Sequence, residues 1–184
     1  ETHPNFNEAS TVFTYDPEMS KSLLAEAGVS NLSLTLLTTD HSWITALSPQ
    51  IKNDLEAVGL SVEIQSLASS ALYADNTDVD SPQFDVVLAP GDPSVFGNDP
   101  DLLMRWWYGD NSWTQKRTQW GGSEGYTALH ELLDAAVRTS GDEQQELWNQ
   151  SFDLLSEEVA LYPLFHRMVV TAYNPAQITG FAPI

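Results

Sequence analysis

The segment that decides the fold is residues 84–89, FDVVLA, a short and nearly continuous apolar run. Such a run predicts a strand that is covered on both faces, as in parallel sheets. Two alternating stretches precede it, residues 32–36 and residues 62–65, in which apolar and polar side chains take turns. Alternation with a period of two predicts strands with one buried face. Three predicted strands therefore lie in the first half of the chain.

Two predicted helices accompany these strands, one before the first strand and one between the first and the second. The first begins at Asp16-Pro17, because aspartate caps free backbone donors and proline suits the first helical position, and it ends at Gly28. The second covers residues 44–58, where apolar residues recur at helical spacing, and Pro49 either kinks it or marks its true start. The order of helix, strand, helix, strand, short helix or loop, and strand predicts an α/β fold with a largely parallel sheet.

The second half of the chain is expected to be irregular at first and helical later. Residues 90–125 are rich in tryptophan, glycine and aspartate and predict no regular element. Two apolar stripes then predict adjacent helices over about 126–139 and 142–159. The tail, 161–173, is predicted to be extended, with one or two strands at an edge. The whole chain, 1–184, is interpreted as a single α/β domain with a mixed sheet and helices on both faces.

Composition excludes several classes of partner. Among 184 residues there are 26 acidic and 7 basic side chains, which gives a formal net charge of −19. This charge repels nucleic acids and anionic membrane surfaces, and no apolar run approaches the roughly 18 residues needed to cross a bilayer. The chain has no cysteine, and its four histidines have no close ligand spacing. We therefore expect no nucleic acid partner, no direct membrane insertion, no metal site and no cofactor.

One short motif points to an enzyme. Residues 121–125, GGSEG, match the G-x-S-x-G pattern of the α/β-hydrolase nucleophile elbow, in which Ser123 would be the nucleophile and His166 would follow it in chain order. The elbow requires a buried strand before the serine, and residues 115–120 are too polar for one. A glycine-rich loop is the favoured interpretation, so we predict no catalytic activity and keep the hydrolase as the alternative.

An aspartate follows the third predicted strand at Asp92. Ligands of open α/β sheets bind beyond the carboxyl ends of strands, so this carboxylate is a candidate partner for a cationic group of a ligand. Asp99 and Asp101 crowd the same stretch, but their spacing does not fit the calcium loop of an EF-hand. A solvated acidic loop is the simpler interpretation of these two residues.

Aromatic residues supply the remaining candidates for ligand contacts. Trp106, Trp107 and Trp113 share one stretch with charged and amide side chains. Aromatic planes beside polar groups suit sugar faces, peptide side chains or organic cations. The alternative is that they pack a loop onto the sheet. His41 and Trp43, which follow the first predicted strand, are further candidates.

Five segments resemble, in the same order, the segments of one protein family. Residues 15–28, YDPEMSKSLLAEAG, resemble its Y-D-P-e-k-A-k-x-L-L-x-e-A-G segment, while residues 50–64 resemble i-q-x-q-L-k-x-i-G-i-x-v-e-i. Residues 84–88 resemble its f-D-l-x-l strand, residues 132–136 its l-l-d-x-A helix, and residues 160–165 its p-x-i-P-L-y segment. The family is that of the bacterial extracellular solute-binding proteins of dipeptide, oligopeptide and nickel ABC importers.

The resemblance implies a periplasmic-binding-protein-like lobe. The segments correspond to the second, C-terminal lobe of a two-lobed protein, so the chain resembles an excised lobe. It implies capture of a peptide-like or other small organic solute without chemistry. The implied partners are the solute, the importer's permease and the first lobe of the same parent chain. The implied location is extracellular or periplasmic. Because many members are lipoproteins, the resemblance also implies tethering to the membrane through the missing N-terminus of the parent chain.

The resemblance also bears on the ligand. Asp92 matches the first aspartate of the family's G-W-x-x-D-x-x-D-P stretch, which pairs with the ligand's amino group in peptide binders. Here the tryptophan of that stretch is lost, and Asp99-Pro100 follows at a longer spacing. Peptides, oligosaccharides, nickel complexes and opines all stay open as ligands. A scaffold or sensor lobe that docks on another protein is a further alternative.

Overall fold

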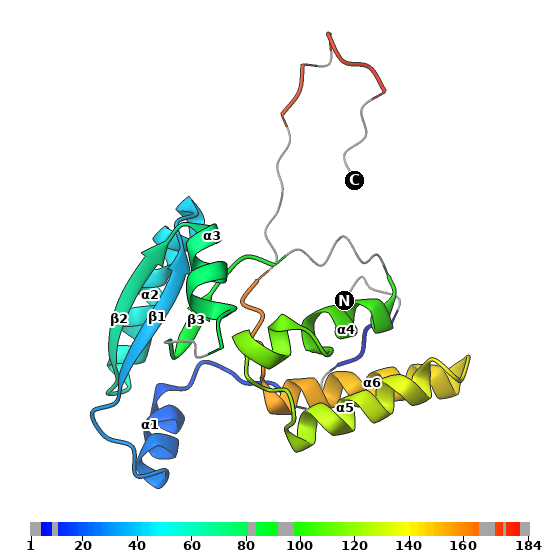
Figure 1. The fold of residues 1–184 in the computed structure, drawn as a ribbon, viewed down its shortest axis with the longest axis horizontal. Helices are drawn as coiled ribbons and strands as arrows, with labels where there is room; N and C mark the ends of the chain where they lie inside the picture. The colour runs from blue at the N-terminus through cyan, green and yellow to red at the C-terminus, as the bar shows by residue number, and fades with distance from the viewer. Residues whose placement is uncertain are drawn as a thin grey trace.

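The computed structural model describes residues 5–8, 11–80, 84–91, 98–165, 172–174 and 176–180. Its elements are, in chain order, α1 (Pro17–Glu26), β1 (Ser33–Thr39), α2 (Ser42–Ala57), β2 (Ser61–Leu67), α3 (Ser69–Ala71), the π-helical turn η1 (Leu72–Thr77), β3 (Val86–Leu88), α4 (Pro100–Tyr108), the π-helical turn η3 (Trp113–Arg117), α5 (Glu124–Ala136) and α6 (Asp142–Glu158). Two parts lie side by side (Figure 1): a sheet half made of β1, β2, β3, α2, α3 and η1, and a helical half made of α4, η3, α5 and α6.

The sheet half confirms the predicted α/β class. Its strands are parallel in the order β2-β1-β3, with Leu36 of β1 opposite Ile64 on one side and Val86 on the other. The helix α2 covers one face, where a small core is formed by Leu36, Ile44, Val62 and Leu88. The short elements α3 and η1 lie on the opposite face (Figure 1). All strands among the described residues are parallel. Of the tail predicted to be extended, residues 161–165 and 172–173 form no strand, and residues 166–171 lie outside the described part of the chain.

The first strand is longer and more deeply buried than its sequence pattern predicts. It runs to Thr39, and Leu36 and the three residues after it are all buried. Thr38 and Thr39 are fully buried, and among the described residues their hydroxyls have no hydrogen-bond partner. As the central strand of the sheet, β1 has neighbours on both edges as well as covered faces, and alternation alone did not indicate this.

The two early helices form as predicted, and the structure decides between the two positions considered for Pro49. Asp16 caps α1 by accepting a hydrogen bond from the Met19 amide at 2.9 Å. None of the α1 residues is buried, however, so the apolar spacing of Met19 and Leu23 does not form a core face here. Pro49 lies inside α2 rather than at its start. None of the described helices is long and apolar enough to cross a membrane.

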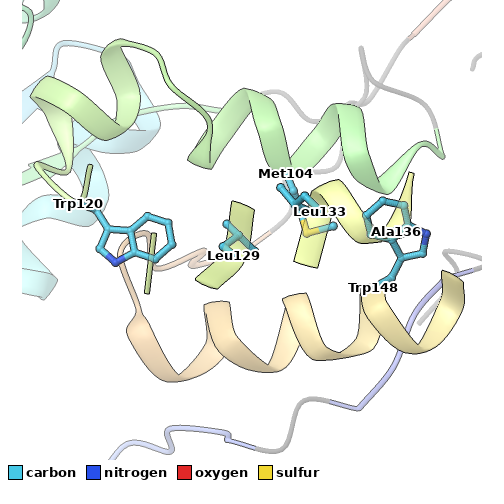
Figure 2. Packing of buried hydrophobic residues seen from close by; sticks show 6 residues of the cluster. All are labelled: Met104, Trp120, Leu129, Leu133, Ala136 and Trp148. Carbon is cyan, nitrogen blue, oxygen red and sulfur yellow. The ribbon is translucent and has the colours of Figure 1, made fainter. Parts of the chain in front are cut away.

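The helical half holds the larger of the two cores. α5 and α6, which the sequence predicts, pack along each other, and six buried side chains form a row between α4 and α6 (Figure 2). These side chains are Met104, Trp120, Leu129, Leu133, Ala136 and Trp148. Since they come from α4, the turn before α5, α5 itself and α6, this core ties the second half of the chain into one unit.

The expectation that residues 90–125 are irregular is wrong, because this stretch contains α4 and η3. The carboxylate of Asp99 accepts hydrogen bonds from the amides of Asp101, at 3.0 Å, and Leu102, at 3.2 Å, and Pro100 occupies the first helical turn. This is the same start signal that predicts α1. The aspartates interpreted as a solvated loop are thus a helix cap and a residue of the first turn.

Candidate ligand-binding site

An open pocket of about 560 Å³ lies where the two halves meet. Its walls come from η1 on one side and from α4 and η3 on the other, and most of its surface is apolar. The residues that define these walls are Tyr73, Leu102, Arg105, Trp106, Trp113 and Arg117. The volume is in the range of pockets that take small organic ligands.

The structure brings two of the three candidate tryptophans to this pocket. Trp106 is 50% exposed on α4, and Trp113 begins η3. Trp107 does not line the pocket but packs edge-on against Trp113, with ring centroids 4.5 Å apart. The other end of the Trp107 ring reaches Gly91, where an added Cβ would lie only 2.8 Å from the indole. The cluster therefore sits beside the carboxyl end of β3.

Arg117 forms the centre of the junction between the halves. Its guanidinium lies 4.3 Å from the ring centroids of both Tyr73 and Trp113, so an aromatic ring covers it from each half. It also donates from Nε and Nη2 to the two carboxylate oxygens of Asp78, at 2.7 and 2.8 Å. The hydrogen bond from Arg117 lowers the pKa of the Asp78 carboxyl. Burial raises the pKa of the Tyr73 hydroxyl above its ordinary value.

The second arginine of the pocket is paired in the same way. Arg105 donates from Nε to Asp101 at 2.8 Å and from Nη2 to Asp134 of α5 at 2.8 Å. The hydrogen bond from Arg105 lowers the pKa of Asp134. Both cationic side chains of the pocket therefore face aspartates before any ligand is present.

Asn111 fixes the backbone around the two wall tryptophans. Its amide nitrogen donates to the carbonyls of Arg105, at 3.1 Å, and Trp106, at 2.9 Å. Its side-chain oxygen accepts from the amide of Trp113 at 2.8 Å. The link between α4 and η3 is thus held by one side chain, which sets the spacing of the aromatic wall.

The other candidate residues lie elsewhere or outside the described residues. Asp92 falls in 92–97, which the structure does not describe. His41 is the residue before α2 and makes no capping bond with its side chain. Trp43 packs against the sheet core and meets Phe165 edge-on at 5.9 Å. Neither His41 nor Trp43 lines the pocket.

The serine of the hydrolase motif has a structural role. Ser123 caps α5, and its hydroxyl oxygen accepts a hydrogen bond from the Tyr126 amide at 3.0 Å. Residues 118–122, all of them described, form a bend, two residues without regular structure and a turn, and no strand. The strand that a nucleophile elbow requires is therefore missing in front of Ser123.

The sequence pattern predicted the tryptophans of the pocket but not its charged residues. Arg105 follows Asp101 by four residues, a spacing that predicts an ion pair once α4 is recognised as a helix. Arg117 and Asp78 are 39 residues apart and belong to different halves. No local pattern indicates that pair, and Tyr73 joins it only through the fold.

Comparison with known proteins identifies relatives of this chain. The family model "Bacterial extracellular solute-binding proteins, family 5 Middle" matches residues 1–120. None of the curated proteins searched matches the chain. Among solved structures, NikA from Staphylococcus aureus in complex with Ni(L-His)2 superposes with a TM-score of 0.67 at 17% identity, covering 85% of this chain and 32% of NikA.

Two further structures have the same fold. DppA from Helicobacter pylori, in complex with the peptide STSA, gives a TM-score of 0.62 at 17% identity over 86% of this chain and 30% of DppA. MelB from Agrobacterium fabrum, in complex with stachyose, gives 0.66 at 18% identity over 85% of this chain and 27% of MelB. The chain therefore spans about a third of the length of these structures.

Proposed function

The chain belongs to the bacterial extracellular solute-binding proteins of family 5, and from this membership we propose that it captures a peptide-like or other small organic solute for an ABC importer. The observation that carries the proposal is the family match, which covers the sheet half, α4 and η3 and so includes every wall of the pocket. On this proposal the chain binds without catalysis, in agreement with the capping role of Ser123.

The chain acts, on the same proposal, as the second lobe of a two-lobed binder. Its coverage of about a third of NikA, DppA and MelB supports this division. The first lobe of the parent chain closes over the solute, and the permease of the importer receives it. The protein works outside the cytoplasmic membrane, extracellularly or in a periplasm, tethered through the N-terminal part of the parent chain.

A panel of solutes tests the capture of a ligand. The protein that contains both lobes is heated with short peptides, oligosaccharides and nickel–histidine, the three classes seen with DppA, MelB and NikA. A ligand that binds only the folded protein raises its melting temperature, and the stabilisation grows with the logarithm of ligand concentration over Kd. We expect one class to do so. A folded protein that responds to none of the three, nor to opines, would contradict the proposal.

Substitutions then locate the wall. Asp92→Asn should weaken binding by about 2–5 kcal/mol if the solute carries a cation that the carboxylate meets in a desolvated site. For a neutral sugar this loss should be much smaller, and Trp106→Ala, or Trp107→Ala through the loss of its contact with Trp113, should weaken binding more. Calorimetry on the two-lobed protein with the solute found above measures all three. If all three folded variants bind the solute as tightly as the wild type does, the solute does not bind at Asp92, Trp106 and Trp107.

A further inference from the structure

We propose that the pocket between η1 and α4 receives an aromatic ring without negative charge and rejects aromatic rings that carry a carboxylate or phosphate. This inference rests on the proposed capture of a solute and adds the class of ligand. It follows from the pocket's aromatic wall together with the pairing of its two arginines.

The wall offers a flat apolar surface. Trp106 is 50% exposed where it lines the pocket, and Trp113 and Leu102 extend the surface beside it. Asn111 bonds the backbone of both tryptophan positions, so the two are spaced before a ligand arrives. Ring faces gain contact area and favourable edge or face geometry against such a wall, and a prearranged wall loses little entropy on binding.

The charges decide which rings fit. Two arginines in one pocket would ordinarily favour an anion. Here the guanidinium of Arg117 is bonded at two nitrogens to Asp78 and covered by Tyr73 and Trp113, and its side chain is only 14% exposed.

Arg105 is bonded to two aspartates, Asp101 and Asp134. The charge of each arginine is thus already balanced by carboxylates, so an anion entering the pocket gains little attraction and is repelled by these aspartates, within a chain of net charge −19. A neutral or cationic ring meets no such repulsion. The aspartates thus act as a filter for charge, and the tryptophans supply the attraction.

Three small probes that share the indole ring system test the proposal on the 184-residue chain. Indole is neutral, tryptamine is cationic and indole-3-acetate is anionic, and each is titrated while the indole N–H signals of the protein are followed by NMR. High salt screens the long-range repulsion of the acidic chain, so a remaining difference is local. We expect indole and tryptamine to shift the Trp106 and Trp113 signals and indole-3-acetate to bind at least tenfold more weakly.

Variants separate the wall from the filter. Trp106→Ala should weaken indole binding at least tenfold, whereas Tyr15→Ala, which removes a 78% exposed aromatic ring outside the pocket, should leave it unchanged. The double variant Asp101→Asn with Asp134→Asn removes the two negative charges that balance Arg105, and it should bind indole-3-acetate at least fivefold more tightly relative to indole than the wild type does.

Several outcomes would overturn the inference. They are equal binding of indole and indole-3-acetate at high salt, no shift with any probe, unchanged indole binding in Trp106→Ala, or no change of charge preference in the double variant. The solute panel on the two-lobed protein is a separate measurement. A solute that stabilises that protein while no ring binds this pocket keeps the proposed function and rejects this inference, and the converse result rejects only the proposed function.

Discussion

The two halves of the molecule are stabilised by cores of different construction. In the helical half, the six buried residues lie between Met104 and Trp148 and include two tryptophans, whose rings reach across several elements. In the sheet half, four aliphatic residues between Leu36 and Leu88 form the core against α2. The helical core consists of large side chains from neighbouring segments. The sheet core consists of aliphatic side chains that parallel strands and the helix between them bring together. The helical core is therefore expected to withstand unfolding better.

The halves meet through polar and aromatic contacts rather than a shared core. Arg117 links η3 to Asp78 and Tyr73, and Lys116 donates to the backbone carbonyl of Asp78 at 2.7 Å. Each of the two hydrophobic clusters in the described part of the chain stays within its own half. We therefore expect the two halves to open separately under native conditions, as cooperative units with different free energies.

The largest expected effect is the loss of a helical core side chain. Leu129 is fully buried between α4 and α6, so Leu129→Ala should lower the free energy of unfolding by about 2–5 kcal/mol through lost burial and the cavity left behind. Urea denaturation measures the total. Hydrogen exchange should show that protection falls in α5 and α6 while β1 and β2 keep most of theirs.

The matched control is a leucine that touches neither core. Leu23 on α1 is 58% exposed, and Leu23→Ala should change the free energy of unfolding by about 0.5 kcal/mol or less. Equal loss of exchange protection in both halves of the Leu129→Ala variant would mean that the molecule unfolds as a single unit. The two halves would then not differ in their free energies of unfolding.

Much of this architecture could be predicted from local sequence, and the failures have identifiable causes. The sheet half follows from the periodicity of its strands and from the helical spacing of apolar residues in α2. The helix α4 carries the same Asp-Pro start as α1, but its setting among tryptophan, glycine and aspartate suggested a loop. Of these two helices, α1 buries no residue and α4 contributes Met104 to a core. Spacing predicts a helix, therefore, but not what covers it.

A smaller effect is expected at the junction. Asp78→Asn removes the charge that Arg117 bonds with two nitrogens and should lower the free energy of unfolding by about 1–3 kcal/mol at neutral pH. The folded pKa of Asp78 lies below the unfolded value of 3.8, so its contribution is fully present well above pH 3.8. It is lost as pH falls through the lower folded pKa. The difference between wild type and variant should therefore shrink in acid.

Asp80 provides the control for this pair. It lies at the same junction, 3.3 Å from the Lys116 ammonium, but its side chain is fully exposed. Solvent screens such a pair, so Asp80→Asn should change stability little at any pH. Urea denaturation of both variants at neutral and acidic pH makes the comparison. A difference between wild type and Asp78→Asn that persists undiminished in strong acid would show that the paired carboxylate is not its source.

The candidate site was only partly accessible from the sequence for the same physical reason. Because the tryptophans follow the third strand, they were predicted to lie near the sheet edge, and the structure puts Trp106 and Trp113 on one pocket wall. The sequence pattern has a limit here. It could not distinguish them from Trp107, which packs against Trp113 instead. The pairing of Arg117 with Asp78 depends on the docking of the two halves. The spacing of residues along the sequence does not predict how the two halves dock.

The smallest expected effect compares two helix caps of the same chemistry. Asp99 and Asp16 each cap a helix that has proline in its first turn, α4 in the helical half and α1 outside both cores. Removing an aspartate cap costs a helix about 0.5–2 kcal/mol. Because α4 contributes Met104 to the helical core, Asp99→Ala should lower the global free energy of unfolding by about 1 kcal/mol. Because α1 buries no residue, Asp16→Ala should leave the global free energy of unfolding unchanged and only speed hydrogen exchange within residues 17–26.

Urea denaturation combined with hydrogen exchange measures both quantities. An equal global loss in the two variants would show that α1 is coupled to one of the cores, and the division of the molecule into two halves with a detached helix would have to be abandoned.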